Sequence, residues 1–381
     1  MRTIYALALA GLLAFLAGTA SVAQDEEEYE LHIADKLLEL KPDARVHVDM
    51  HAGQVDLQGF NIEVPKDTKA LYVNVLEATT DIDLVLCDGK LDSIDDLDDH
   101  ELTEAMTARV NEVMAWTPDD GLKPGKFVVY AGSLAAYEDE EVSFDILLSF
   151  NDKPKLDTPK LPFKPLDQLT PMQRAVAASV MLYTEEGAGG SGTVVTPGGL
   201  IVTNHHVIEN EDGGTLKQVW VSFAPDARKL PVQTHIATVI EDDPDLDLAL
   251  LQISTDLDGN KVEKPNFVWL PLAADECELG DEIRSLGYPA IGGSRSLTSI
   301  TLTRGVVSGF LEKQGKLRWY KSDCLLSAGN SGGTTINAKF ELAGIPTETL
   351  HDPDTMESLS YIRPVQLIPA KWIERIKKEV K

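Results

Sequence analysis

Short runs in which apolar and polar residues alternate recur along residues 31–150. Residues 70–76 and 142–148 are two such runs, and turn-forming pairs such as Asp88-Gly89 separate them. Because successive side chains of a strand point to opposite faces, a period of two residues indicates a sheet with one buried face. The pattern predicts a half-buried antiparallel sheet in this part of the chain.

Residues 99–116 depart from this alternation, because their apolar side chains recur at helical spacing and Pro118 follows them. Spacings of three and four residues place side chains on one face of a helix. We therefore expect one helix inserted among the strands of this region. The apolar positions are Leu102, Met106, Val110, Val113 and Met114.

A proline-rich segment, residues 151–170, separates two parts of the chain. Its prolines alternate with lysines and aspartates, which favours an extended, semi-rigid linker. In residues 171–381, runs rich in Val, Ile and Thr alternate with Gly, Pro and Asp turns, which predicts a second, mainly β domain. Its last segment, from Pro369, has apolar residues at helical spacing and a basic end, so it predicts an amphipathic C-terminal helix.

The first 23 residues have the pattern of a secretory signal peptide. Arg2 precedes an apolar run over residues 4–17, and small residues stand at Ser21 and Ala23, the positions that a signal peptidase reads. We expect cleavage after Ala23 and a secreted or periplasmic protein with no membrane insertion once the segment is removed. An uncleaved membrane anchor is the alternative.

The formal net charge of the 381-residue chain is −28. Such an acidic surface repels nucleic acid and anionic lipid, so we expect neither as a partner. The charge suits a solvated extracytoplasmic surface, and attraction of basic substrates or calcium is the alternative. The three cysteines, Cys87, Cys277 and Cys324, exclude a disulfide scaffold but leave open a bridge between the last two.

Three short motifs, far apart in the sequence, carry candidate chemistry. A serine hydroxyl is a poor nucleophile at neutral pH, so it needs a base that accepts its proton and a third group that orients the base. We expect Ser331 to attack, His206 to accept and return the proton, and Asp247 to hold the imidazole. The motifs are residues 203–207 (Thr-Asn-His-His-Val), 247–250 (Asp-Leu-Ala-Leu) and 329–333 (Gly-Asn-Ser-Gly-Gly).

The glycines around Ser331 permit a sharp turn in the backbone. Such a turn would aim the N–H groups of Gly329 and Ser331 at the negative charge that develops on a substrate carbonyl oxygen. We therefore expect these two groups to form an oxyanion hole.

Two of these assignments have rivals. We expect Asp247 to stand in a mostly apolar strand, where a buried carboxylate needs a partner such as His206. The alternatives are Asp245, two residues earlier, as the partner of His206, or a solvated strand end with no role. His205 neighbours His206, and only one of two adjacent strand side chains can face a cleft. We expect His205 to be a packed bystander, with a two-histidine metal site as the alternative.

Through these motifs, residues 171–378 resemble the protease domain of the HtrA (Deg) branch of trypsin-like serine proteases. The order His, Asp, Ser is that of the trypsin fold, and further matching runs are 190–195, 199–204, 287–289, 305–309 and 343–345. The resemblance implies two six-stranded β-barrels with the triad between them, no metal or organic cofactor, and cleavage of protein or peptide substrates in unfolded or exposed segments. Residues 31–150 resemble the prepeptidase-type β-sandwich domains that accompany secreted peptidases.

The resemblance also implies a primary specificity pocket. At several positions this sequence departs from the family pattern. Leu325, Leu326 and Ile345 should line this pocket and favour small or medium apolar side chains before the cleaved bond. We expect no PDZ domain after the closing helix. Thr334 and Thr335 replace the usual residues after the double glycine, and Pro346 lacks an N–H that a substrate-pairing strand could use.

The sequence therefore predicts a serine endopeptidase with an N-terminal accessory β-sandwich. Pro346 and the double threonine favour a second hypothesis, a trypsin-fold binding or chaperone-like protein without turnover. A third hypothesis gives the accessory domain the main function, binding calcium or polysaccharide through acidic loop residues, although such loops are usually only solvated. These residues are Asp81, Asp83, Asp92, Asp95 and Asp96.

Overall fold

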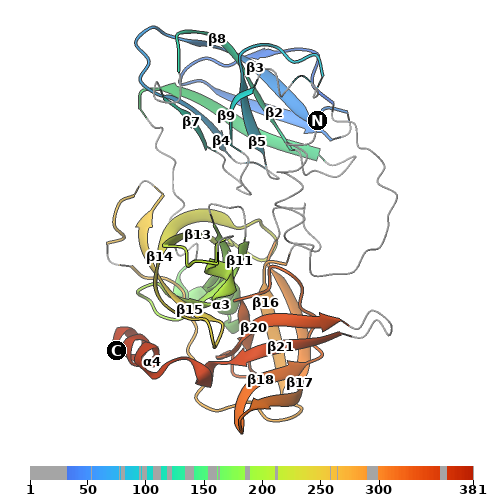
Figure 1. Ribbon diagram of the computed structural model, residues 1–381, viewed down its shortest axis with the longest axis vertical. Coiled ribbons are helices and arrows are strands. Elements are labelled where there is room, and N and C mark those ends of the chain that lie inside the picture. Colours follow the sequence, from blue (N-terminus) through green and yellow to red (C-terminus); the bar gives the residue numbers. More distant parts are fainter. Residues whose placement is uncertain are drawn as a thin grey trace. The chain divides into compact units, whose positions relative to one another are not determined.

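The computed structural model describes residues 32–52, 54–76, 78, 82–93, 96, 101–105, 113–117, 122–133, 141–152, 161, 164–184, 189–210, 213–257, 259–263, 265–289, 299–351 and 358–380. These residues form two compact units, one within residues 32–152 and one within residues 161–380 (Figure 1). The expected signal peptide, residues 1–23, and much of the expected linker lie outside the described residues. Among the described residues, no helix is long and apolar enough to cross a bilayer.

The first unit is a β-sandwich of two sheets. Its five-stranded sheet has the order β1 (Leu38–Glu39), β3 (Leu57–Val64), β8 (Gly125–Gly132), β5 (Asp83–Cys87), β6 (Glu101–Ala105). Its four-stranded sheet has the order β2 (Arg45–His51), β9 (Glu141–Phe150), β4 (Leu71–Leu76), β7 (Val113–Trp116). Apolar side chains from both sheets, such as Phe60 and Phe144, pack into one core, as the alternating pattern predicts.

The helix expected over residues 99–116 is wrong, because two strands, β6 and β7, occupy its ends. In β7, Met114 and Trp116 are buried in the sandwich core and Ala115 between them is exposed, which is the two-residue period of a strand. Pairing of β7 with β4 joins Met114 to Val73 and Trp116 to Leu71. Tertiary pairing with an apolar neighbour strand thus overrides the helical spacing of the local sequence.

The second unit contains two closed, six-stranded antiparallel β-barrels (Figure 1). Its first α-helix among the described residues is α3 (Pro171–Ala178), which begins with a capping box between Thr170 and Gln173. The first barrel consists of β10 (Ser179–Tyr183), β11 (Gly189–Val194), β12 (Leu200–Thr203), β15 (Leu248–Asp256), β14 (Val232–Asp243) and β13 (Gln218–Phe223). The second consists of β16 (Glu282–Gly287), β17 (Thr301–Lys313), β18 (Lys316–Ser322), β21 (Ser358–Pro364), β20 (Leu342–His351) and β19 (Thr334–Ile336). Mainly β architecture with a double barrel is confirmed.

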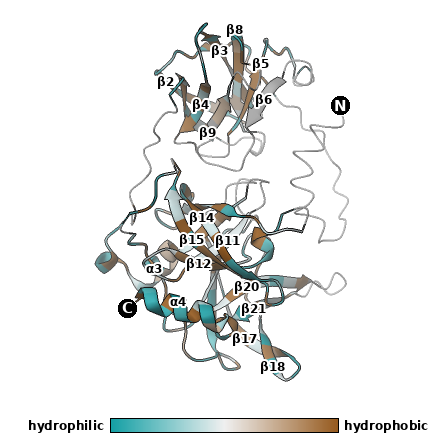
Figure 2. Cartoon of the chain, turned by 60° about the vertical axis from the view of Figure 1, so that its left-hand side comes forward, coloured by the Kyte–Doolittle hydropathy of each residue, from teal (hydrophilic) through white to brown (hydrophobic). Residues whose placement is uncertain are grey.

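The C-terminal helix, α4 (Ala370–Val380), is also confirmed. Its apolar stripe buries Trp372 and Ile376, and the indole N–H of Trp372 donates to Glu241 of β14 at 2.8 Å. Apolar and polar residues alternate around this helix in Figure 2. Burial of this stripe fixes α4 against the first barrel.

The double threonine after the Ser331 turn lies in a buried network of hydroxyl groups. Thr334 contacts the hydroxyl groups of Ser179 and Thr193 at 2.7 Å each, and Thr335 contacts that of Ser285 at 2.8 Å. Both threonines are buried. Since β10 and β11 belong to the first barrel and β16 and β19 to the second, this network joins the barrels beneath the turn.

Cys277 and Cys324 are buried free thiols, so the bridge left open between them is not formed. Burial raises the pKa of the Cys277 thiol to about 11, which keeps it protonated and unreactive at neutral pH. The Cys324 thiol lies 3.0 Å from the hydroxyl of Thr303.

Candidate active site

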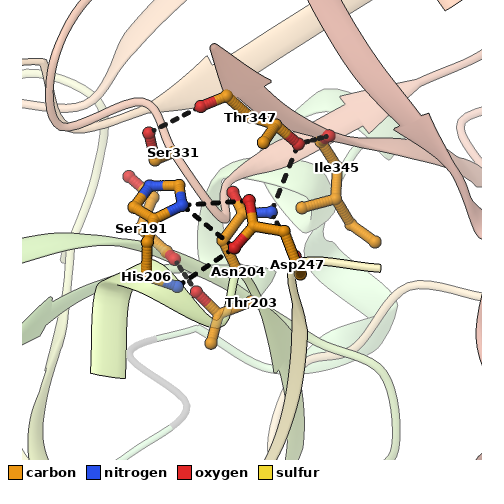
Figure 3. Close-up of polar contacts among 8 residues, drawn as sticks. All are labelled: Ser191, Thr203, Asn204, His206, Asp247, Ser331, Ile345 and Thr347. Atoms are coloured by element: carbon orange, nitrogen blue, oxygen red, sulfur yellow. Dashed lines mark hydrogen bonds and ion pairs between the residues drawn. The ribbon is translucent and has the colours of Figure 1, made fainter. Parts of the chain in front are cut away.

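The imidazole of His206 lies against the carboxylate of Asp247 (Figure 3). His206 begins a short 3-10 segment, His206–Ile208, directly after the buried strand β12. Its Nδ1 lies 3.1 Å from Oδ1 and 3.0 Å from Oδ2 of Asp247, and its backbone N–H donates to Oδ1 at 3.0 Å. These contacts place the proton of the imidazole on Nδ1 and leave Nε2 as a base.

Asp247 stands in a turn directly before β15 and not inside a strand as its apolar surroundings suggest. Its φ of 51° lies in the left-handed region, which costs a residue other than glycine roughly 1 kcal/mol. The side chain of Asn204 stabilises this conformation by donating to the Asp247 carbonyl at 2.8 Å. A strained backbone at this position orients the carboxylate towards His206.

The rival residues have other partners. Asp245 is exposed, and its carbonyl oxygen accepts a hydrogen bond from Arg318 at 2.5 Å. His205 is largely buried, and its Nδ1 lies 3.1 Å from the carboxylate of Asp242. No cluster of three or more histidine, cysteine or acidic side chains that could hold a metal ion occurs among the described residues. Of the acidic residues considered for calcium, Asp81 and Asp95 lie outside the described part of the chain.

Ser331 lies in a turn in which two positions have a backbone conformation that favours glycine. Gly329 has φ 94° and Gly332 has φ 79°. A Cβ atom on Gly332 would lie 2.0 Å from the hydroxyl of Thr203 and 2.3 Å from the carbonyl oxygen of Ser191. The turn therefore packs directly against β11 and β12 of the first barrel.

The hydroxyl group of Ser331 donates to the carbonyl oxygen of Thr347 at 3.1 Å (Figure 3). It does not bond to the imidazole in this conformation, although Figure 3 draws the His206 ring between Ser331 and Asp247. Thr347 stands at a register shift between Pro346 and Glu348 of β20. This bulge leaves Thr347 outside the regular pairing of β20 with β21. The sequence pattern gives no role to Thr347, because only this bulge brings it to the site.

The two N–H groups expected to form an oxyanion hole, those of Gly329 and Ser331, have no acceptor among the described residues. The other N–H groups of the turn are bonded: Asn330 to Ser327, Gly332 to Pro346, and Gly333 to Asn330, at 2.9 to 3.0 Å. Two adjacent free donors on a fixed turn can stabilise a negatively charged oxygen.

Pro346 has no backbone N–H, but its carbonyl group takes part in the hydrogen bonding of the site. Its carbonyl oxygen accepts a hydrogen bond from the N–H of Gly332 at 2.9 Å, so it supports the Ser331 turn. Of the residues expected in the specificity pocket, Leu325 is 66% exposed and Leu326 is buried. Ile345 has no exposed surface, so it presents nothing to an open pocket in this structure.

Comparison with known proteins defines the class of the second unit. Residues 190–345 match the family model described as a trypsin-like peptidase domain. The chain therefore contains a trypsin-like peptidase domain, which agrees with the double barrel.

The curated relatives of this domain are serine proteases of the HtrA and Deg type. The serine endoprotease DegS of Escherichia coli (strain K12) is 28% identical over 47% of this chain and 45% of its own length. The mouse (Mus musculus) serine protease HTRA4 is 33% identical over 42% of this chain and 30% of its own. The periplasmic serine endoprotease DegP of E. coli (strain K12) is 30% identical over the same two shares.

A crystal structure of the serine endoprotease from Yersinia pestis has 27% identity, a TM-score of 0.39, and coverage of 54% of this chain and 65% of that one. The match spans less than half of the length of the curated relatives.

Proposed function

We propose that this chain is a serine endopeptidase with the triad His206, Asp247 and Ser331. The observation that carries the proposal is the contact of His206 Nδ1 with both carboxylate oxygens of Asp247, at 3.0 and 3.1 Å, beside the Ser331 turn. A bidentate carboxylate fixes the tautomer and orientation that a general base needs.

In the proposed reaction the Ser331 hydroxyl first leaves the Thr347 carbonyl and turns to His206 Nε2. The Oγ atom then bonds to the substrate carbonyl carbon while Nε2 takes the hydroxyl proton, and the electron pair of the C=O bond moves to the oxygen. The N–H groups of Gly329 and Ser331 stabilise this oxyanion, and Asp247 stabilises the imidazolium.

The tetrahedral intermediate collapses to an acyl-enzyme. The C–N bond breaks as Nε2 returns its proton to the leaving amine. Water then attacks the ester with His206 again as base, and the carboxylic acid leaves Ser331 with its proton restored.

Extended protein or peptide segments are the proposed substrates. Strand β20 pairs with β19 only at Leu342 and Gly344, so its edge from Thr347 onwards has β21 as its one strand partner among the described residues. An unfolded segment can add to such an edge as a further strand. The exposed Leu325 beside the turn favours an apolar side chain before the cleaved bond.

Residues 31–150 are proposed as an accessory β-sandwich domain, 151–170 as a linker and 171–381 as the peptidase domain. The signal-peptide pattern of residues 1–23 and the periplasmic DegP relatives support a secreted or periplasmic location.

Cleavage of an unfolded protein tests the proposal. The purified full-length protein should cleave casein, and Ser331→Ala should abolish cleavage with no change in thermal unfolding. Ser308→Ala, which deletes an exposed hydroxyl of β17, is the matched control and should cleave as the wild type does. Equal cleavage by Ser331→Ala would refute the assignment.

The bond of Ser331 to Thr347 instead of His206 favours a second candidate, a binding protein without turnover. Such a protein would retain casein on a column and release it intact. Fragments in the eluate from the wild type, and none from Ser331→Ala, would exclude this candidate.

A further inference from the structure

Ser191, in β11 of the first barrel, contacts the nucleophile turn at two points. The residue is fully buried. Its backbone N–H donates to the Ser331 carbonyl at 2.8 Å, and its side-chain Oγ lies 2.6 Å from the Gly329 carbonyl oxygen. Thr203 of β12 fixes Ser191 in turn by donating to its carbonyl oxygen at 2.7 Å (Figure 3).

The direction of the side-chain hydrogen bond follows from the partners of Ser191 Oγ. The backbone N–H of Tyr288 lies 2.9 Å from this oxygen and can only donate to it. The hydroxyl group has a single proton, and the Gly329 carbonyl can only accept. The proton of Ser191 is therefore committed to Gly329, and the oxygen is occupied by Tyr288.

This bond holds the peptide group that connects the two free donors. The N–H of Gly329 belongs to the peptide group before it, and the N–H of Ser331 belongs to the one after it. Each peptide group is planar, and this group joins the other two through the Cα atoms of Gly329 and Asn330, so holding its carbonyl restricts the rotations that would turn either N–H away. Gly329 has φ 94°, and glycine populates positive and negative φ about equally because it lacks a Cβ, so contacts from outside the turn must hold this conformation.

Neighbouring atoms close the space around the Ser191 hydroxyl. A Cβ on Gly287 would lie 3.1 Å from Ser191 Oγ, and one on Gly333 would lie 3.2 Å from Ser191 Cβ. Without the hydroxyl, the buried Gly329 carbonyl loses its donor, and rotation of that peptide group towards another partner becomes favourable.

We propose that Ser191 is a positioning residue that holds the oxyanion hole in its donating geometry. The inference rests on the proposed function, because it assigns Ser191 a task in the same reaction. Ser191 touches neither the substrate nor the reacting atoms; it acts through the Gly329 carbonyl.

Steady-state kinetics of the full-length protein test this role with a fluorogenic peptide built on a mapped casein cleavage site. For Ser191→Ala we expect kcat to fall roughly 10- to 100-fold, below the loss for a deleted oxyanion donor, with KM within about twofold. The inhibition constant of a peptide aldehyde, whose hemiacetal oxygen enters the hole, should rise by a similar factor. Ser285→Ala is the matched control, because it deletes a similarly buried hydroxyl whose one hydrogen-bond partner among the described residues is Thr335.

Each outcome decides the inference. A kcat within twofold of the wild type, or a rise in KM alone, overturns it. An equal loss in Ser285→Ala also overturns it, because the loss would then reflect general packing. Failure of the wild type to cleave casein or the peptide refutes the proposed function itself, and the inference falls with it.

Discussion

At the residue scale, the candidate site depends on one carboxylate, that of Asp247, in a strained turn. Its left-handed backbone is held by Asn204, and its two oxygens contact His206. In the proposed reaction this carboxylate orients the imidazole and offsets the charge that the ring acquires during proton transfer.

Replacement of Asp247 by asparagine should lower kcat by roughly 10³- to 10⁴-fold with little change in folding. The carboxamide keeps the shape of the side chain but loses the negative charge, and its NH₂ group favours the wrong tautomer of His206. Measurement of kcat with the fluorogenic peptide checks this. Asp245→Asn changes a neighbouring exposed carboxylate and should stay within twofold of the wild type. Equal effects of the two substitutions would contradict the assignment.

His235 gives a second prediction at this scale, because it lies buried with its ring edge-on against Phe223 and Phe267. Burial lowers the pKa of His235 to about 4, below its unfolded value of 6.5. Between pH 4 and pH 6.5 the unfolded chain binds a proton at this histidine more strongly than the folded chain does. The contribution of neutral His235 to the free energy of unfolding is therefore complete above pH 6.5 and is lost as the pH falls towards 4.

Between pH 7 and pH 5 this loss amounts to about 2 kcal/mol of unfolding free energy. His235→Phe removes the titrating group, so the variant should lose less stability than the wild type over that interval. Urea unfolding at the two pH values measures the difference. Parallel losses in both proteins would show that His235 is not the group responsible.

The residues of the motifs could be assigned from the sequence, because their types and order carry the chemistry. The contacts of Ser331 and Asp247 could not. The bond of Ser331 to Thr347 depends on a bulge in β20, and the left-handed turn at Asp247 depends on Asn204, which is 43 residues distant. Such contacts arise only when strands from different parts of the chain meet.

At the element scale, α4 and β7 show which patterns can be read locally. The apolar stripe of α4 is continuous and ends at exposed lysines, so its spacing alone predicts a helix. The apolar residues within 99–116 also recur at helical spacing. In the folded chain, however, Met114 and Trp116 pair with residues of β4 and are buried in the sandwich core. Packing with a distant strand decided the structure there, and a single sequence does not reveal it.

Deletion of the Trp372 side chain should destabilise the second unit by about 3 to 5 kcal/mol, because it empties a fully buried site and removes the bond to Glu241. Trp372→Ala should therefore lower the thermal unfolding temperature of that unit. Lys377→Ala, an exposed position in the last turn of the same helix, should change stability by less than about 0.5 kcal/mol. An undiminished unfolding temperature in Trp372→Ala would mean that α4 contributes little to the fold.

At the scale of the whole molecule, the chain combines a β-sandwich with a trypsin-like peptidase domain. The mainly β class and the double barrel could be predicted, since ordered motifs resembling a known family specify far more than periodicity does. All of the proposed catalytic groups lie in the second unit. The sandwich has a hydrophobic core of its own.

The central claim is that Ser331 is a nucleophile activated by His206. The most direct measurement is labelling of the full-length protein with a fluorophosphonate probe, followed by mass-spectrometric mapping of the modified residue. The account predicts one adduct, on Ser331, that is lost in Ser331→Ala and strongly slowed in His206→Ala. No adduct on the folded wild-type protein, or an adduct on Ser331 that forms as fast without His206, would contradict it.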